Sequence, residues 1–373
     1  MRIPHGTSLL GAYDTFGRPE RPTSGAGYNN QAAARAGAPP PSCAVVLFLH
    51  ARKDTMQSSP ATEPVRYSFL GPRGTFCFAA LQQVASEDTA TFVPAVDVPS
   101  ALRMVRAGQT DAAVVPIENS VEGGVNATLD SLTAGSPLEI RGEMLVPIAF
   151  SLAVRPGTRA ADIRRVATHP HAWAQCRTWI AEHLTDAVHV PATSTAAAAR
   201  ELAENPDADF DAAICAVPTT GVYGLASLSD EIADNRNAVT RFIKVSKPGE
   251  IPPATGSDKT TLMVRLASEK PGALLEMLQQ FAAVGVNLSR IESRPAGDQL
   301  GRYAFSLDAE GHIHDERVQA ALIGLHRICP EVTFLGSYAR ADRQTTRLHA
   351  GTSDEDFGAA RTWVASLLSR VTR

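Results

Sequence analysis

The chain has 373 residues, 44% of them hydrophobic, and a net charge of −4 at pH 7. It can therefore bury a sizeable core, and we expect two or three domains. The small negative charge excludes the electrostatic footprint of a nucleic-acid-binding or membrane-surface protein, so the expected partners are small molecules and other copies of the chain. Five scattered cysteines, an odd number, are typical of reduced cytoplasmic thiols.

Residues 1–64 are rich in Gly, Pro, Ala and Ser and show no sustained period. This composition predicts a disordered N-terminal extension. Met56 is an alternative start of translation. The apolar run 44–49 is too short to cross a bilayer and too far from the start for a signal peptide.

A strand, loop and helix pattern begins at Arg66. Residues 67–70 predict a short strand, and Thr75 is placed to cap the helix that follows. Residues 111–117 predict a buried strand. Further segments of this kind are a helix around 128–132, an alanine-rich helix over 196–202 opened by Ser194, and a strand over 211–216. Alternating strands and helices predict parallel α/β sheets, which bind ligands at the carboxyl ends of their strands.

Residues 142–155 form a long extended apolar segment that suits a crossing between two α/β lobes. We therefore predict a two-lobed domain over 65–246 with a ligand cleft between the lobes. Residues 247–257 are a linker by their Pro and Gly content. A compact βαββαβ pattern, predicting a ferredoxin-like domain, occupies 258–340, and a polar tail with a short apolar helix covers 341–373.

Several motifs stand in one order along the chain, and together they resemble the prephenate dehydratase family. They are Gly71-Pro72-Arg73-Gly74-Thr75-Phe76, Pro116-Ile117-Glu118-Asn119-Ser120 with its following glycines, His169-Pro170-His171-Ala172, Tyr223-Gly224-Leu225 and Thr240-Arg241-Phe242. The C-terminal region is similar to the ACT regulatory domain of those enzymes, because Gly272-Ala273-Leu274 and Glu292-Ser293-Arg294-Pro295 match its two phenylalanine-associated motifs.

The resemblance implies a fold like a periplasmic binding protein and the conversion of prephenate to phenylpyruvate in phenylalanine synthesis. It also implies a homodimer or homotetramer inhibited by phenylalanine, with no metal and no organic cofactor. The chain departs from the family at Cys77-Phe78, where Ser-His is common, at Thr168, often Ser, and at Arg236, often Pro. We therefore place no catalytic role at position 78.

The reaction must bind two carboxylates and help hydroxide to leave. Thr240 is the predicted hydrogen-bond donor to the departing hydroxyl; its alternative is a strand threonine. Arg241 alternates with it and is either a carboxylate clamp or a structural ion-pair residue. Phe242 is more simply explained by packing in the core than by stacking on the substrate ring. Glu118 is a candidate acid if burial raises its pKa, and otherwise a structural carboxylate.

Loops that open helices carry hydroxyl and amide side chains, and helix N-termini attract anions. N-capping explains any one of Thr75, Asn119-Ser120 and Ser194 taken alone. The convergence of their loops on one cleft, however, predicts carboxylate binding. His169 either binds a carboxylate or caps a helix, and the His169–His171 pair lacks the further ligands of a metal site. The predicted substrate-binding residues are Thr75, Asn119, Ser120, His169, Ser194 and Arg241.

The predicted effector site for phenylalanine lies in the C-terminal domain. Gly272 permits close approach of the backbone, and the helix start at Ala273 offers N–H groups to a carboxylate; a turn glycine is the alternative. Asn287 and Ser293 are expected to complete the pocket across a subunit interface. The full predicted set is Gly272, Ala273, Leu274, Asn287, Glu292, Ser293 and Arg294.

Two other functions stay open at this stage. One is arogenate dehydratase, which would use the same scaffold on an amino-acid substrate. The other is a catalytically inactive amino-acid sensor, against which the intact Thr240 and Asn119-Ser120 argue. Deletion of residues 258–373 is expected to leave activity and abolish inhibition by phenylalanine.

Overall fold

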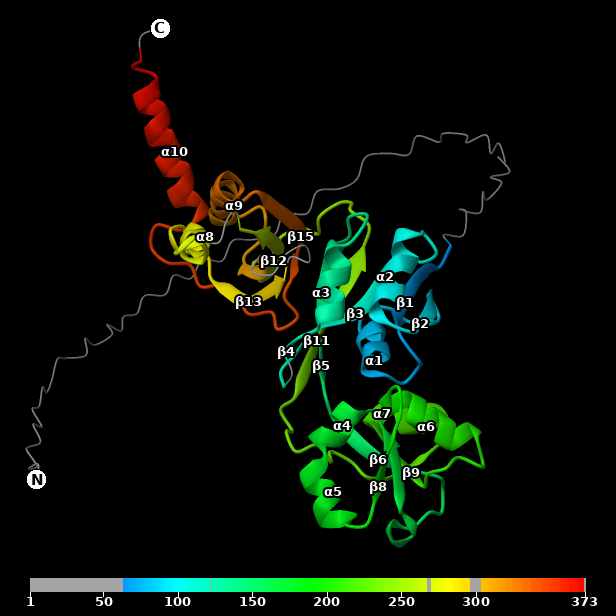
Figure 1. Ribbon diagram of the computed structural model, residues 1–373. Coiled ribbons are helices and arrows are strands. Elements are labelled where there is room, and N and C mark those ends of the chain that lie inside the picture. Colours follow the sequence, from blue (N-terminus) through cyan, green and yellow to red (C-terminus); the bar gives the residue numbers. More distant parts are fainter. Residues whose placement is uncertain (1–62, 122, 267–269, 296–302, 372–373) are drawn as a thin grey trace, which may run out of the picture. The chain divides into compact units, whose positions relative to one another are not determined.

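The computed structural model describes residues 63–121, 123–266, 270–295 and 303–371. Apart from Glu63 and Pro64, the predicted N-terminal extension lies outside these residues. The described chain forms three sheets with their helices, labelled in Figure 1. The mixed α/β architecture predicted from the sequence is confirmed, with a two-lobed domain followed by a smaller C-terminal domain.

Lobe 1 is built on a sheet with the strand order β2-β1-β3-β11-β5, and the short β4 pairs with β3. β1 is parallel to β2 and β3, whereas β11 runs antiparallel to both its neighbours. The elements are β1 Val65–Leu70, α1 Phe76–Gln82, β2 Ala90–Ala95, α2 Val98–Arg106, β3 Ala112–Asn119, β4 Gly123–Gly124, α3 Asn126–Thr133, β5 Glu139–Pro147 and β11 Val239–Ser246.

Lobe 2 has the sheet order β10-β6-β9-β7-β8. The predicted crossing is present, because β5 ends in the first sheet and β6 begins the second after two residues. The elements are β6 Phe150–Val154, a 3-10 turn Ala160–Asp162, β7 Arg165–Thr168, α4 Pro170–Gln175, α5 Arg177–His183, β8 Val188–Pro191, α6 Thr195–Glu204, β9 Ala212–Ala216, α7 Val217–Tyr223 and β10 Ala226–Ser229. The chain then returns to lobe 1 as β11.

The C-terminal domain has the order β13-β14-β12-β15, in which all neighbours are antiparallel, as in a ferredoxin-like fold. One face of the sheet is covered by α8 and α9 (Figure 1), and Phe281 of α8 and Leu325 of α9 share an apolar core with Leu262 and Leu307 of the sheet. The elements are β12 Asp258–Arg265, α8 Ala273–Ala282, β13 Leu288–Pro295, β14 Tyr303–Glu310, α9 Glu316–Ile328, β15 Glu331–Ala339 and, in the tail, α10 Asp354–Leu368.

The other face of this C-terminal sheet packs on lobe 1. Met263, Leu335 and Tyr338 belong to the same buried cluster as Ile117 and Leu129 of lobe 1. At Gly336 the backbone has a φ of +138°, and an added Cβ would lie 2.3 Å from the carbonyl oxygen of Ile140. Because the two domains share a core, the structure changes our expectation that residues 258–373 form a module that can be deleted without loss of activity.

Candidate active site

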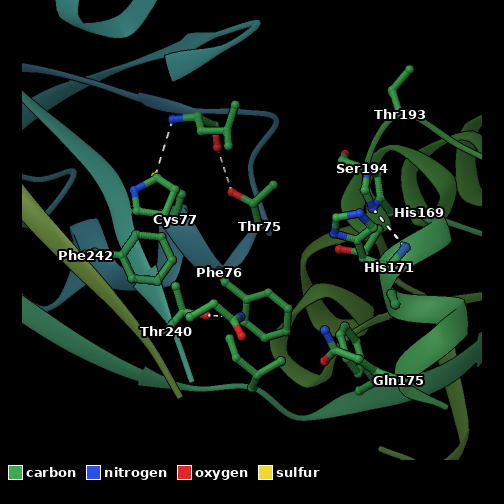
Figure 2. Close-up of a pocket in the computed structure, with 17 residues that line it drawn as sticks. Thr75, Phe76, Cys77, His169, His171, Gln175, Thr193, Ser194, Thr240 and Phe242 are labelled. Atoms are coloured by element: carbon green, nitrogen blue, oxygen red, sulfur yellow. Dashed lines mark hydrogen bonds between the residues drawn. The ribbon is translucent and has the colours of Figure 1, made fainter. Parts of the chain in front are cut away.

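A cavity of about 310 Å³ lies between lobe 1 and lobe 2. Figure 2 shows Thr240, Phe242 and Thr75 on one wall and His169, Ser194 and Gln175 on the opposite wall. The described lining residues are Leu70, Thr75, Phe76, Cys77, Pro116, Asn119, Ile148, Phe150, His169, His171, Ala172, Gln175, Thr193, Ser194, Thr195, Thr240 and Phe242. None of them is Lys, Arg, Asp or Glu, so the polar groups of the described wall are hydroxyls, amides and imidazoles.

Thr240 is held in this wall by a neighbouring strand. Its Cα is in register with that of Asn119 on β3, and Asn119 Nδ2 donates to Thr240 Oγ1 at 2.9 Å. Asn119 Oδ1 in turn accepts from the backbone N–H of Val121 at 2.8 Å, which fixes the orientation of the amide. A hydroxyl that accepts one bond keeps its own hydrogen for donation, so Asn119 prepares Thr240 to donate to a ligand.

Successive side chains along β11 point to opposite sides of the strand. Thr240 and Phe242 line the cavity, and Arg241 lies on the opposite side of the strand. The register shift next to Phe242 leaves this alternation intact, because the extra residue lies on β3 rather than β11. Phe242 is buried in an apolar cluster with Phe69 and Phe78, which agrees with a packing role.

Arg241 does not bind at the cavity, and the assignment of this residue to substrate binding is corrected. Its side chain is 6% exposed and is occupied by acidic partners. The distances are 2.8 Å from Nε to Glu143, and 3.0 and 2.6 Å from Nη1 to Glu118 and Asp308. A guanidinium surrounded by carboxylates is not available to a second anion, so the ion-pair alternative describes it.

Glu118 and Ser120 also lie outside the cavity lining. Glu118 pairs with Arg241 and its side chain is 38% exposed, so the burial that its role as an acid required is absent. Ser120 Oγ accepts from the backbone N–H of Val239 at 2.9 Å, and its own N–H donates to the Val239 carbonyl. These two residues hold β3 and β11 together next to Thr240. The assignments of Glu118 as a catalytic acid and of Ser120 as a substrate-binding residue are therefore corrected.

The predicted hydroxyl and imidazole groups from the helix-opening loops do reach the cavity. Ser194 caps α6, accepting from the N–H of Ala197 at 3.0 Å, and Thr75 caps α1, accepting from the N–H of Phe78 at 3.2 Å. His169 caps α4 through Nδ1, which accepts from the N–H of His171 at 3.3 Å. Capping and lining the cavity are therefore compatible in all three.

Other lining residues were missed by the sequence analysis. Gln175 is the last residue of the short helix α4, and no periodicity singles it out. His171 was considered as part of a metal pair and not as a cavity residue. Within the described residues, no group of three or more His, Cys, Asp or Glu side chains is placed to hold a metal ion.

Cys77 lines the cavity but is not a thiolate. Its Sγ donates to the carbonyl of Val114 at 3.1 Å and accepts from the N–H of Leu70 at 3.3 Å. Burial raises the pKa of the Cys77 thiol to about 12, against the smaller opposing effect of the Leu70 N–H. A thiolate nucleophile is therefore not populated at neutral pH.

The predicted effector residues of the C-terminal domain lie on two different surfaces. Gly272 has a φ of +88° and opens α8 beside the exposed Leu274. On β13, Glu292 pairs with Arg290, and Arg294 pairs with Asp130 of α3 at 2.7 Å. Glu292 also lies against Gly124 of lobe 1, where an added Cβ would be 1.9 Å from the Glu292 carboxylate. The side chains of Glu292 and Arg294 thus face lobe 1, and their assignment to the effector pocket is corrected; Asn287 and Ser293 are exposed.

Comparison with known proteins gives consistent matches. A family model described as prephenate dehydratase matches residues 67–250, and one described as ACT domain matches residues 260–327. A curated relative named prephenate dehydratase, from Mycobacterium marinum, is 44% identical over 281 residues, 73% of this chain and 88% of the relative. In the described part of the chain, no helix is long and apolar enough to span a membrane.

Two solved structures are similar over most of the chain. The prephenate dehydratase of Arthrobacter aurescens in complex with L-Phe is 56% identical, with a TM-score of 0.78, covering 82% of this chain and 100% of that one. A structure titled as a novel type of quorum quenching acylase, GqqA, is 30% identical, with a TM-score of 0.67, covering 75% and 100%. The scaffold alone therefore does not fix the activity.

Proposed function

Because the chain belongs to the prephenate dehydratase family and carries an ACT domain after its catalytic domain, we propose that prephenate reacts in the cavity between the two lobes, with Thr240 as hydrogen-bond donor to the departing hydroxyl. The observation that carries this role is the 2.9 Å bond from Asn119 to Thr240 in the cavity wall. It orients the threonine so that its hydrogen is available to a ligand.

The reaction breaks two bonds of the substrate. The bond from the ring to one carboxylate breaks, its electron pair enters the ring, and carbon dioxide leaves. The bond from the opposite ring carbon to the hydroxyl breaks, and the hydroxide takes up a proton to leave as water. Thr240 has too high a pKa to release a full proton at pH 7, so it assists by hydrogen bonding, and the proton that the hydroxide takes up is supplied by solvent.

The lack of Lys, Arg, Asp and Glu in the described cavity wall supports this role. A carboxylate that is to lose carbon dioxide reacts faster when it is poorly solvated and unpaired. The described lining holds no Lys or Arg, and the nearby Arg241 is occupied by Glu143 and Asp308. We assign the carboxylate that is retained to lobe 2, where Ser194 and the N-terminus of the ten-residue helix α6 face the cavity.

The direct test is the formation of phenylpyruvate by the purified full-length chain. We expect turnover of prephenate and a lower specificity constant for arogenate. A folded protein that turns over neither substrate would overturn the assignment in favour of an inactive sensor. A higher specificity constant for arogenate would make the chain an arogenate dehydratase.

We also propose that phenylalanine binds the C-terminal domain between two copies of the chain. β12 and β13 run in the same direction, so Gly272 lies at one end of β13 and Asn287 at the other. One copy does not bring these two residues together. Exposed Leu274, Leu275 and Ile291 on α8 and the edge strand β13 supply apolar surface for a second copy.

This effector proposal predicts a homodimer or homotetramer. We expect phenylalanine to lower the rate of prephenate turnover, and Leu275→Glu to weaken both self-association and inhibition. Analytical ultracentrifugation with and without phenylalanine checks the first point. Inhibition of a Leu275→Glu protein that is monomeric would place the effector site within one copy. A cytoplasmic location is proposed from the four cysteines among the described residues, Cys77, Cys176, Cys215 and Cys329, which are buried free thiols, and cell fractionation tests it.

A further inference from the structure

Arg241 lies in a buried network of charged side chains that joins lobe 1 to the C-terminal domain. We call it the interface network; its members are Glu143 and Arg241 from lobe 1, and Lys259, Arg290, Asp308 and Tyr338 from the C-terminal domain. Asp308 is fully buried and accepts from Arg241 at 2.6 Å and from Arg290 at 2.9 Å. Tyr338 Oη lies 3.2 Å from Arg241 Nη2. The network is therefore continuous across the contact between the domains.

Within lobe 1, Arg241 connects three adjacent strands at the level of Thr240. It sits on β11, pairs with Glu118 on β3 and pairs with Glu143 on β5. Thr240 is the preceding residue on β11, so the position of its backbone depends on where Arg241 is held. The hydrogen bond between Asn119 and Thr240 joins the same two strands, β3 and β11.

The charges of the interface network depend on partners from both domains. Desolvation by burial lowers the pKa of Arg241, but Asp308, Tyr338 and Glu143 together raise it well above its usual range. Burial likewise raises the pKa of Asp308, and Arg241 and Arg290 reverse this, holding it well below its usual range. Removal of one partner leaves an uncompensated buried charge, which forces its neighbours to move or to admit water.

We propose that Arg241 and Asp308 are positioning residues for Thr240, so that a carboxylate of the C-terminal domain sets the geometry of the dehydration site. The proposal rests on the proposed role of Thr240. Loss of the Asp308 charge displaces Arg241 and with it the β11 backbone, which moves the Thr240 hydroxyl relative to Asn119 and the substrate. Displacements of about 1 Å at a reacting centre cost up to ~100-fold in rate.

The test compares kcat and KM for prephenate in four full-length single variants and in the double variant that combines Asp308→Asn with Thr240→Val. Asp308→Asn keeps the volume of the side chain and removes its charge, and we expect kcat to fall ~10- to ~100-fold with KM changed less than ~3-fold. Tyr338→Phe removes one hydrogen bond to Arg241, and we expect kcat to fall ~3-fold. Arg361→Gln is the control, because Arg361 of α10 pairs with Glu316 of α9 and with no member of the interface network; its kcat is expected to stay at the wild-type value.

The fourth variant, Thr240→Val, separates the role of Thr240 as hydrogen-bond donor from the positioning role of Asp308. If Asp308 acts through Thr240, Asp308→Asn lowers kcat in the wild-type background and has little further effect in the Thr240→Val background. Equal effects in both backgrounds would overturn the proposal. Wild-type kcat in Tyr338→Phe and in folded Asp308→Asn would also overturn it while leaving the role of Thr240 intact. If Asp308→Asn does not fold, wild-type kcat in Tyr338→Phe overturns the proposal. Wild-type kcat in Thr240→Val would remove that role and the proposal together.

Discussion

The cavity between the lobes and the contact between lobe 1 and the C-terminal domain share one strand, β11, but they are built from different side chains. The described cavity wall holds no Lys, Arg, Asp or Glu, and its polar groups are hydroxyl, amide and imidazole groups among apolar ones. The interface network on the other side of β11 consists of charged side chains that are buried and paired. A single residue step, from Thr240 to Arg241, separates the two environments.

In the proposed mechanism, one strand contributes both to the chemistry and to the association of the domains. Fixed charges beside a carboxylate that must leave would stabilise the reactant, so they are disadvantageous in the cavity. On the opposite side of the strand, we propose that the paired charges restrict the backbone of Thr240. The alternation of side chains along β11 keeps the two functions apart.

The largest effect is expected when the C-terminal domain, which supplies four members of the interface network, is removed altogether. Deletion of residues 258–373 would take Asp308 and Tyr338 from Arg241, take Lys259 from Glu143, and expose the core shared by Ile117 and Leu129. We expect more than ~100-fold loss of turnover and loss of cooperative thermal unfolding. Turnover assays and circular dichroism melts check this.

A shorter truncation is the matched control for that deletion. Truncation after Ala350 removes α10, which has no buried residue, and leaves the C-terminal sheet in place. We expect its kcat to match that of the full chain. A protein lacking residues 258–373 that keeps wild-type kcat would contradict the shared-core account.

The cavity side is tested by Asn119→Ala, which removes the donor to Thr240. We expect kcat to fall about 100-fold, because the threonine hydroxyl loses its fixed orientation. Asn205→Ala is the matched control, since Asn205 Oδ1 also accepts a backbone N–H two residues on, at 3.1 Å, but lies away from the cavity. Equal rates in the two variants would contradict a special role of Asn119.

The buried Asp308 of the interface network predicts how the stability of the fold changes at acid pH. The pKa of Asp308 is lowered in the folded state, so its contribution to stability is present above the unfolded pKa, about 4, and is lost as the pH falls below it. The stability difference between wild type and Asp308→Asn should stay constant from pH 5 to 8 and shrink by about 1.4 kcal/mol per pH unit below about pH 4. Urea unfolding across pH measures it; a difference that does not shrink would contradict the buried pair.

Ser194→Ala probes the opposite wall of the cavity. The variant loses a helix cap, worth about 1 kcal/mol of stability, and a hydroxyl that faces the cavity. We expect KM to rise ~5-fold with a small change in kcat. Ser353→Ala removes the same kind of cap from α10, far from the cavity, and should lower stability without changing KM. An unchanged KM in Ser194→Ala would exclude this residue from substrate binding.

The smallest effect is expected for Cys77→Ser. Because burial raises the pKa of the thiol to about 12, the thiolate is absent at working pH, and kcat should change less than ~2-fold. Iodoacetamide should leave activity unchanged over the time of an assay. Rapid inactivation that Cys77→Ser abolishes would contradict this assignment.

The sequence predicted the fold and several of the residues that line the cavity. Helix-opening positions predicted Thr75, Ser194 and His169, because capping residues and strand ends are local features. The role of Arg241 was left open since its decisive partner, Asp308, is 67 residues away in another domain. Glu118 and Ser120 were misplaced because neighbours in a motif point to different faces of a strand or turn.

The central claim is that Thr240 assists the departure of hydroxide in the cavity. The most direct measurement is kcat for prephenate in Thr240→Val, with circular dichroism and phenylalanine binding as controls for folding. Valine keeps the shape of the side chain and removes the hydroxyl. We predict at least ~100-fold lower kcat with the fold and phenylalanine binding unchanged. A folded Thr240→Val enzyme with wild-type turnover would contradict the account.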